Sequence, residues 1–278
     1  MADPTTRTVS PLFAGTLMAE AGARPATWRL AEEAPAAVMY DGQFFAVMMV
    51  TPADLEDFAV GFTVTEGIVA SADEILDVRV AEANDGYALN IKIPAARLTG
   101  IETRRRVLTG RSGCGICGAQ TLDAAVAPPR PVRGAKPGFA ELTRAYAEFP
   151  GFQVMNRENH STHAAGFAKP DGAVLMVRED VGRHNALDKL AGGLLRAKIT
   201  AANGFIVMSS RCSMELVQKA AILGVPFLAT VSAPTALAAR LAAAAGMGIA
   251  AYSPHGLMLF DDTVSEGQPS GRTKDPDQ

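Results

Sequence analysis

The chain has 278 residues, 48% of them hydrophobic and 20% charged, and a formal net charge of −3. This length can bury one large core or two modest ones, and the composition is that of an ordinary globular protein. The small net charge gives no overall reason to expect nucleic acid or an anionic membrane as a partner. Three cysteines, an odd number, do not make a disulfide framework, so we expect a cytoplasmic protein.

Neither a signal peptide nor a membrane segment is expected. The first residues, 1–7, lack the charged-then-apolar pattern of a signal peptide. The apolar stretch 225–251 is long, but Pro226, Pro234 and Arg240 interrupt it, so it reads as buried strand and helix.

The N-terminal part is predicted as an extended lead-in, residues 1–35, and an α+β unit, residues 36–127. Asp41-Gly42 separates two apolar runs and suits the positive-φ positions of a type I′ hairpin turn. Thr51 is expected to cap a helix that runs from Pro52 to about Thr65, since threonine favours the N-cap and proline the first helical position. A second hairpin is expected from two further runs, 75–82 and 87–93.

The next feature is a Cys-x-x-Cys pair, Cys114 and Cys117, set among three glycines. Glycine lets a partner approach the backbone closely because it has no Cβ. Residues 119–125 read as the opening of a helix, and a thiol at a helix N-terminus has a lowered pKa and is more nucleophilic. Cys114 is therefore the first candidate for a reacting atom.

Three interpretations of this pair remain open on spacing alone. Structural zinc needs four ligands, and His160 and His163 are the only other strong candidates, so we expect no metal. Those two histidines are more often hydrogen-bonded loop residues. A dithiol switch has the right spacing but lacks the usual βαβ setting. The third interpretation is a persulfide carrier, in which Cys114 accepts sulfane sulfur and passes it on.

The C-terminal half alternates short apolar strands with helices. A linker, 128–138, and a helix near 139–149 precede it. Strands are expected at 173–177, 205–208, 226–231 and 248–251, and helices at 185–198, 213–223 and 234–245. The alternation predicts a mostly parallel sheet covered by helices over residues 139–262. The polar remainder, 263–278, is expected to be a disordered tail.

Polar residues follow the ends of these strands, where ligands bind in open parallel sheets. The candidates are Arg178, Asp180, Arg183 and His184, then Ser209 and Arg211, then Ser232, then Tyr252, Ser253 and His255. Helix N-termini follow the first three strand ends and offer free N–H groups to an anion. A phosphate-bearing ligand is therefore expected, with Arg183 and Arg211 as forked donors.

Structural roles compete with these assignments. Arg178, Glu179, Asp180 and Arg183 could form an ion-pair network of their own, as such clusters often do. Cys212 begins a helix and is expected to be a small buried residue.

Several motifs, in order along residues 35–245, resemble the formate dehydrogenase accessory sulfurtransferase family, FdhD. They are Thr51-Pro-Ala-Asp-Leu-Glu-Asp-Phe-Ala-Val-Gly-Phe62 with Thr65-Glu-Gly67, Cys114-Gly-Ile-Cys-Gly118, Arg178-Glu-Asp-Val-Gly-Arg-His-Asn-Ala-Leu-Asp-Lys189, Ser210-Arg-Cys-Ser-Met-Glu-Leu-Val-Gln-Lys219 and Ser232-Ala-Pro-Thr-Ala-Leu-Ala238. Together they are far more specific than a Cys-x-x-Cys pair.

The resemblance implies an α/β fold: a cytidine-deaminase-like α/β domain with a smaller N-terminal α+β part, usually as a homodimer. It implies a sulfurtransferase that takes persulfide sulfur from a cysteine desulfurase and delivers it to the molybdenum or tungsten bis-guanine-dinucleotide cofactor of formate dehydrogenase. That cofactor would be a bound substrate, with no permanent cofactor. Cys114 would carry the persulfide and Cys117 would assist. Deaminase activity is not expected, because the His-x-Glu element of the zinc deaminases is missing.

By the same resemblance, the cofactor-binding residues would be the strand-end candidates together with His163, Pro254, Gly256 and Leu257. Three departures bear on them. Asn159-His-Ser-Thr-His163 replaces a glycine-rich family loop, and Ser210 stands where a glycine is usual. Tyr252–Leu257 lacks the arginine of a family segment associated with cofactor binding. The alternative function is a cofactor-binding chaperone that moves no sulfur.

Overall fold

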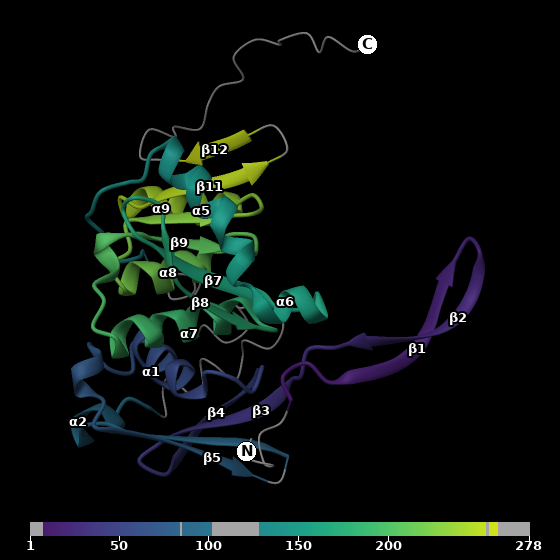
Figure 1. Cartoon of the computed structure of the whole chain (residues 1–278). Coiled ribbons are helices and arrows are strands. Elements are labelled where there is room, and N and C mark those ends of the chain that lie inside the picture. Colours follow the sequence, from purple (N-terminus) through teal and green to yellow (C-terminus); the bar gives the residue numbers. More distant parts are fainter. Residues whose placement is uncertain (1–7, 84, 102–127, 254–255, 261–278) are drawn as a thin grey trace.

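The computed structural model describes residues 8–83, 85–101, 128–253 and 256–260. Two main parts lie one above the other in Figure 1, a four-stranded sheet with helix α1 (Leu55–Thr65) below and a six-stranded sheet with helices on both faces above. A third element, a two-stranded hairpin, projects to the side.

The lower sheet has the strand order β4-β3-β6-β5. Its strands are β3 (Ala34–Tyr40), β4 (Gln43–Val50), β5 (Asp77–Ala83) and β6 (Gly86–Lys92), and only β3 and β6 run parallel among its pairings. Asp41 and Gly42 have φ values of 48° and 79°, which confirms the predicted hairpin turn. Burial alternates strictly along β3, so one face of the sheet packs on α1 and the other does not. Two short helices, η1 (Ala72–Glu74) and α2 (Ala95–Leu98), complete this part.

The predicted start of α1 is wrong by three residues. The helix begins at Leu55, and its N-cap position is Asp54, whose side chain makes no capping hydrogen bond. The Thr51 hydroxyl instead accepts the Val181 N–H at 3.1 Å, and the Thr51 N–H donates to Asp180 at 2.9 Å. Thr51 therefore bonds to residues far away in the sequence and does not cap the helix. The predicted end at Thr65 is confirmed, with Gly67 at φ 66° just beyond.

The upper sheet has the strand order β12-β11-β10-β9-β7-β8. The strands are β7 (His163–Ala168), β8 (Val174–Asp180), β9 (Phe205–Met208), β10 (Phe227–Thr230), β11 (Gly248–Ser253) and β12 (Gly256–Phe260). The prediction of a mostly parallel sheet is wrong for the described strands, because only β9/β10 and β10/β11 pair in parallel. The two strands that the sequence did not predict, β7 and β12, run antiparallel to all their neighbours.

Helices cover both faces of the upper sheet. One face packs on α5 (Phe139–Phe152) through Leu142, Ala145 and Phe149. The opposite face packs on α7 (Arg183–Arg196), α8 (Met214–Ile222) and α9 (Ala236–Ala244). Short helices α6 (Val154–Asn159) and η2 (Ala201–Asn203) lie in connections. The helices predicted in this half are confirmed to within a few residues. The result is a three-layer α/β unit.

The predicted linker is closely attached to this unit. Residues 128–138 form no helix or strand, but Val132 is buried in the core beneath α8 and α9. Its N–H donates to the Ala245 carbonyl at 2.8 Å.

The two main parts meet where α1 crosses α7. Gly61 and Gly192 make the close approach possible, because a Cβ on either would lie 1.8 Å from a carbonyl oxygen of the other helix. Buried charges surround the crossing. Lys219 contacts Asp188 at 2.9 Å and Glu66 at 2.7 Å, and fully buried Lys189 contacts Asp180 at 2.6 Å. The two parts are therefore connected by a joint, which consists of this tight helix crossing and the buried ion pairs around it.

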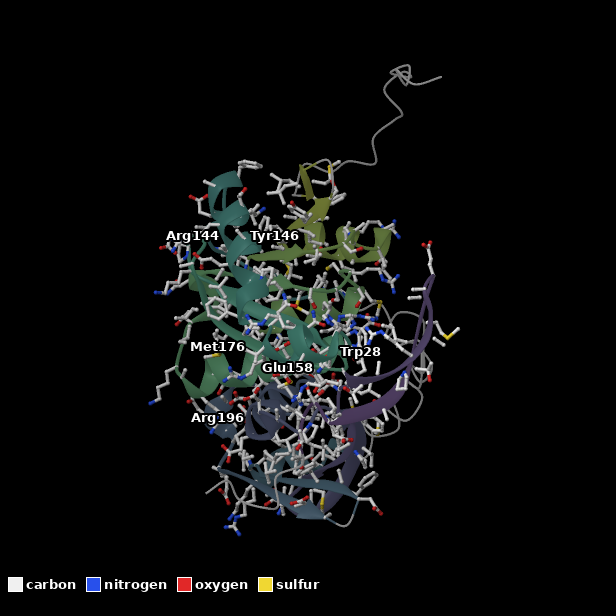
Figure 2. The ribbon with its side chains drawn as sticks, turned by 45° about the vertical axis from the view of Figure 1, so that its right-hand side comes forward. Trp28, Arg144, Tyr146, Glu158, Met176 and Arg196 are labelled. Carbon is white, nitrogen blue, oxygen red and sulfur yellow. The ribbon has the colours of Figure 1, made fainter. Side chains whose placement is uncertain are left out.

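The lead-in contains a structure that the sequence did not predict. Residues Leu12–Ala19 form β1 and Gly22–Arg29 form β2, paired antiparallel as a hairpin. At its base, the Trp28 ring lies 5.7 Å from the His160 ring, and Arg29 approaches Glu158 at 3.9 Å. Figure 2 shows Trp28 and Glu158 on the same side of the molecule. Among the described residues, no helix is both long and apolar enough to cross a membrane.

Candidate functional site

The predicted site residues converge on one edge of the upper sheet. Since β7 is antiparallel to both β8 and β9, strands β8, β9, β10 and β11 all point the same way. Their carboxyl ends therefore share an edge, and β7 begins there, with His163 opposite Asp180. The turn from Ser253 to Gly256 also lies at this edge. The mixed sheet thus preserves the arrangement expected from a parallel one.

Arg183 occupies the first position of α7, after the N-cap residue Gly182. Its Nε is buried and has no hydrogen-bond partner among the described residues. A buried donor without a partner is costly, and an acceptor at this helix N-terminus would satisfy it. Arg183 is therefore suited to an anionic ligand, and among the described residues it forms no ion pair with Glu179 or Asp180.

His184 brings the starts of α7 and α8 together. Its Nε2 lies 3.4 Å from the Ser213 hydroxyl, at the N-cap position of α8, and 3.9 Å from Glu215. Burial, reinforced by the Arg183 charge, lowers the pKa of His184 to about 4. The same two causes lower the pKa of half-buried His163. A neutral His184 ring offers one donor and one acceptor at neutral pH.

The polar residues that follow β9 and β10 differ in their surroundings. The Ser209 hydroxyl accepts the Ala164 N–H at 2.8 Å and so ties β9 to β7. Arg211 and, after β10, Ser232 are exposed. Exposed Arg211 is accessible to a ligand, whereas Ser209 already has a structural contact.

Arg178 and Asp180 serve the joint between the two parts. Fully buried Asp180 accepts from Thr51, Gly182 and Asn185 and pairs with Lys189, so no face of its carboxylate is open. Arg178 pairs with Asp57 of α1 at 2.7 Å. The structure thus gives both residues structural partners, as in the competing ion-pair interpretation. Asp57 and Thr51 lie on the N-terminal part, whereas Lys189 lies on α7 of the same unit as Asp180.

The C-terminal candidates form the β11–β12 hairpin. The Tyr252 ring is half-exposed and lies 5.2 Å from the Tyr146 ring, whose hydroxyl donates to the Thr230 carbonyl at 2.8 Å. Ser253 donates to the Gly256 carbonyl at 2.9 Å, and Gly256 has φ 123°. Leu257 is partly buried, while Pro254 and His255 lie outside the described residues. Tyr252 offers an exposed aromatic face at the edge of the sheet.

The loop that departs from the family pattern is built around Asn159, a residue the sequence did not single out. Its side chain accepts the Ser161 N–H at 2.9 Å and donates to the Ser10 hydroxyl at 3.1 Å. His160 follows with φ 55° and faces Trp28, so it points toward the hairpin. Glu179 accepts two N–H groups at the start of α6, at 2.9 and 2.8 Å. Asparagine side chains often accept a hydrogen bond from the backbone two residues further on, so an asparagine in this loop was the sequence signal for the turn.

Cys114 and Cys117 lie outside the described residues. Cys212 lies within them and is fully buried, as predicted, and burial raises the pKa of its thiol to about 12. A thiol with that pKa is unreactive at neutral pH. In the part of the chain that the structure describes, no three His, Cys, Asp or Glu side chains gather as a metal ion would require.

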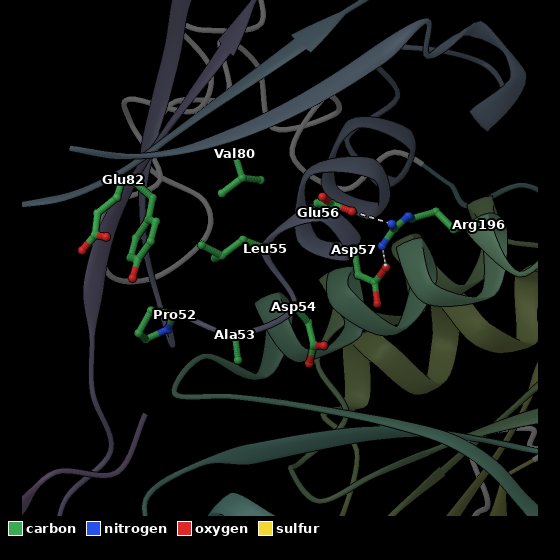
Figure 3. A pocket seen from close by; sticks show the side chains of 10 residues that line it. Pro52, Ala53, Asp54, Leu55, Glu56, Asp57, Val80, Glu82 and Arg196 are labelled. Atoms are coloured by element: carbon green, nitrogen blue, oxygen red, sulfur yellow. Dashed lines mark hydrogen bonds and ion pairs between the residues drawn. The ribbon is translucent and has the colours of Figure 1, made fainter. Parts of the chain in front are cut away.

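An open depression of about 470 Å³ lies between the start of α1, strands β5 and β6 and the end of α7 (Figure 3). Its carboxylates are Asp54, Glu56, Asp57 and Glu82. Arg196 pairs with both Glu56 and Asp57, as the dashed lines show. These ion pairs hold α7 to α1, so the depression belongs to the joint between the two parts.

Comparison with known proteins identifies the family. The model of the FdhD/NarQ family matches residues 31–259, which include the four-stranded sheet, the six-stranded sheet as far as Leu259 and the candidate site. The chain belongs to the FdhD/NarQ family. The family resemblance predicted from the motifs is thereby confirmed.

Curated FdhD/NarQ relatives are similar over most of the chain. The chain is 43% identical to the sulfur carrier protein FdhD of Xanthomonas axonopodis pv. citri, with 97% of this chain and 100% of the relative covered. It is 45% identical to the sulfur carrier protein FdhD of Agrobacterium fabrum, with 82% and 85% covered. A crystal structure of a formate dehydrogenase accessory protein from Desulfotalea psychrophila superposes with a TM-score of 0.71 at 24% identity, covering 91% and 97%. This last likeness supports the overall fold.

Proposed function

We propose that this FdhD/NarQ protein is a sulfurtransferase that accepts persulfide sulfur on Cys114 and delivers it to the molybdenum or tungsten bis-guanine-dinucleotide cofactor of formate dehydrogenase. The observation that carries the proposal is the full-length similarity to proteins named sulfur carriers, in a chain that has the Cys114/Cys117 pair. A cysteine desulfurase is the proposed donor.

The loading step is a thiol exchange. The Cys114 thiolate attacks the terminal sulfur of a donor persulfide, forming a new S–S bond while the donor's S–S bond breaks. The electron pair leaves with the donor sulfur as a thiolate, and Cys114 then carries –S–SH. No net oxidant or reductant is needed, because the sulfane sulfur keeps its oxidation state.

The edge of the upper sheet is the proposed binding site for the cofactor. Arg183, with its unpartnered Nε at the start of α7, and exposed Arg211 would donate to phosphate oxygens. Neutral His163 and His184 would add uncharged hydrogen bonds, and the exposed Tyr252 face would stack on a flat ring. Asp180 is fully paired and would act only by holding the start of α7 in place.

Three further features belong to the same proposal. We propose that the α/β unit is cytidine-deaminase-like, in keeping with its helix-covered sheet, and that the protein works in the cytoplasm as a homodimer. Proposed partners are the desulfurase and formate dehydrogenase, with neither nucleic acid nor membrane.

The test is intact-protein mass spectrometry after incubation with a cysteine desulfurase and cysteine, followed by peptide mapping. We expect a gain of one sulfur atom on the peptide that contains Cys114. Cys114→Ala should abolish the gain and Cys212→Ala, at the buried thiol, should not. No gain on either Cys114 or Cys117, when a known acceptor is loaded in parallel, would refute sulfur transfer and favour the cofactor-binding chaperone.

A further inference from the structure

The β1–β2 hairpin projects from the body of the molecule, and almost none of the residues that the structure describes pack on it (Figure 1). All eight residues of β1 and seven of the eight residues of β2 are exposed. Large apolar side chains are among them, including Leu12 at 60%, Met18 at 75% and Trp28 at 54% exposure. An isolated two-stranded hairpin is only marginally stable in water, whereas a sheet of three or more strands can be stable. The hairpin therefore needs a further strand.

The free edge of β1 is a suitable template for that strand. The Leu30 N–H donates to the Pro11 carbonyl at 3.0 Å, which sets the phase of the ladder. Because hydrogen-bonded pairs alternate along an antiparallel ladder, every second residue of β1 turns its N–H and C=O outward. The outward residues are Leu12, Ala14, Thr16 and Met18. No residue of Leu12–Ala19 is charged or is proline, so nothing blocks pairing at this edge.

The free edge of β2 is blocked. Pro25 lies opposite Thr16, in the row of β2 residues that face outward. Proline has no N–H to offer and interrupts an edge where it lies. Arg24 and Arg29 add charge to the same strand. The hairpin thus has one open edge and one protected edge.

We propose that β1 pairs antiparallel with β1 of a second copy of this chain, forming a four-stranded sheet in the order β2-β1-β1-β2 across a two-fold axis. An antiparallel pair of identical strands is self-complementary, as a two-fold interface requires. In one register every outward residue is used, with Leu12 opposite the partner's Met18 and Ala14 opposite the partner's Thr16. That register also places the two most exposed apolar side chains of β1 against each other.

The hairpin carries exposed apolar surface that a second copy could contact. A half-exposed Phe13 and a half-exposed Trp28 leave roughly 200 Å² uncovered, since each ring buries about 150–250 Å² when fully enclosed. Leu12, Leu17 and Met18 add to this area. In a single hairpin these apolar side chains stay exposed to solvent, and exposed apolar side chains that lie close together are typical of a protein contact. The homodimer implied by the family resemblance does not specify a surface, and this inference supplies one.

The test replaces an outward residue without removing any hydrogen bond of the hairpin. Thr16→Pro deletes the outward N–H, and native Pro25 directly opposite shows that this level of the hairpin accepts proline. By sedimentation velocity we expect the wild type at twice the 29.0 kDa chain mass and Thr16→Pro at 29.0 kDa, with unchanged far-ultraviolet circular dichroism. Thr27→Pro, at an outward position on the protected edge, is the matched control and should stay dimeric.

Hydrogen exchange supplies the local readout. Amides of Ala14, Thr16 and Met18 should exchange slowly in the wild type. In Thr16→Pro, which keeps the Ala14 and Met18 amides, these two should exchange at least tenfold faster. If the proline variant does not fold, Thr16→Lys blocks the edge by charge and serves instead. The inference is overturned by a monomeric wild type, by a dimeric edge variant, or by a wild-type dimer whose outward β1 amides exchange as freely as an open edge.

Discussion

The closest contact between the two main parts offers a direct test of how they are joined. Gly192 lies inside α7 against α1, and an ideal Cβ there would sit 1.8 Å from the Asp57 carbonyl oxygen and 2.6 Å from its carbonyl carbon. Real Cβ atoms essentially never come within 3.0 Å of another heavy atom, so Gly192→Ala forces the helices apart by at least 3.0 − 1.8 = 1.2 Å. Both obstructing atoms belong to backbone, and no side-chain rotation can relieve the clash.

Two opposing terms set the magnitude. Alanine in place of glycine favours a helix interior by about 1 kcal/mol. Overpacking costs about 1–3 kcal/mol or more, and separating α1 from α7 also stretches the contacts of Asp57 with Arg178 and Arg196. We therefore expect a net loss of about 2 kcal/mol in the free energy of unfolding. For a chain of this length that lowers the melting temperature by roughly 4–8 °C.

Gly151→Ala is the matched control. Gly151 also lies within a helix, α5, but an added Cβ meets nothing within 4 Å, so this variant should be neutral or slightly stabilised. Differential scanning calorimetry and urea titration of both variants measure the contrast. Equal stability of Gly192→Ala and Gly151→Ala would show that the helix crossing is looser than the structure indicates.

Two further predictions concern titratable groups. Lys219→Met should cost about 3 kcal/mol at pH 7, since it leaves buried Asp188 without its cation. The loss should shrink at pH 5, because burial already raises the pKa of Asp188 to about 6 and the unpaired acid then binds a proton; a urea titration at each pH measures it. His184→Gln should reduce the fall in stability between pH 6.5 and 4: with its pKa lowered to about 4 in the folded state, His184 binds its proton more readily in the unfolded chain, so acid favours unfolding. Thermal midpoints across that range that fall equally in wild type and variant would contradict this assignment.

Local patterns in the sequence predicted most elements but not all. The Asp41-Gly42 turn and helices α7, α8 and α9 follow from turn chemistry and period, which are local properties. Strand β7, His-Ala-Ala-Gly-Phe-Ala, contains no β-branched residue and gives no strand signal of its own. It forms because it lies between two well-defined strands, β8 and β9, and hydrogen-bonds with both.

The location of the candidate site was predictable even though the sheet type was not. The strand-end argument needs only that β8, β9, β10 and β11 share a direction, and inserting antiparallel β7 leaves that direction unchanged. Individual roles were less predictable. Thr51 looked like a helix cap, but its partners are Asp180 and Val181, about 130 residues further along the chain. No local pattern reports such a contact.

The motif Arg178–Lys189 contains residues of two kinds, those that hold the fold together and those that are available to a ligand. Most of its polar members are already paired within the protein: Arg178 with Asp57, Glu179 with the start of α6, Asp180 with Lys189, Asn185 with the Met49 carbonyl and Asp188 with Lys219. Among the described residues, the Arg183 Nε has no partner and the His184 contacts with Ser213 and Glu215 are long, at 3.4 and 3.9 Å. The paired residues fix the start of α7 against the N-terminal part, and that placement presents Arg183 and His184 at the edge of the sheet. Substituting the paired residues should therefore unfold the joint, whereas substituting Arg183 should weaken anion binding and leave the fold intact.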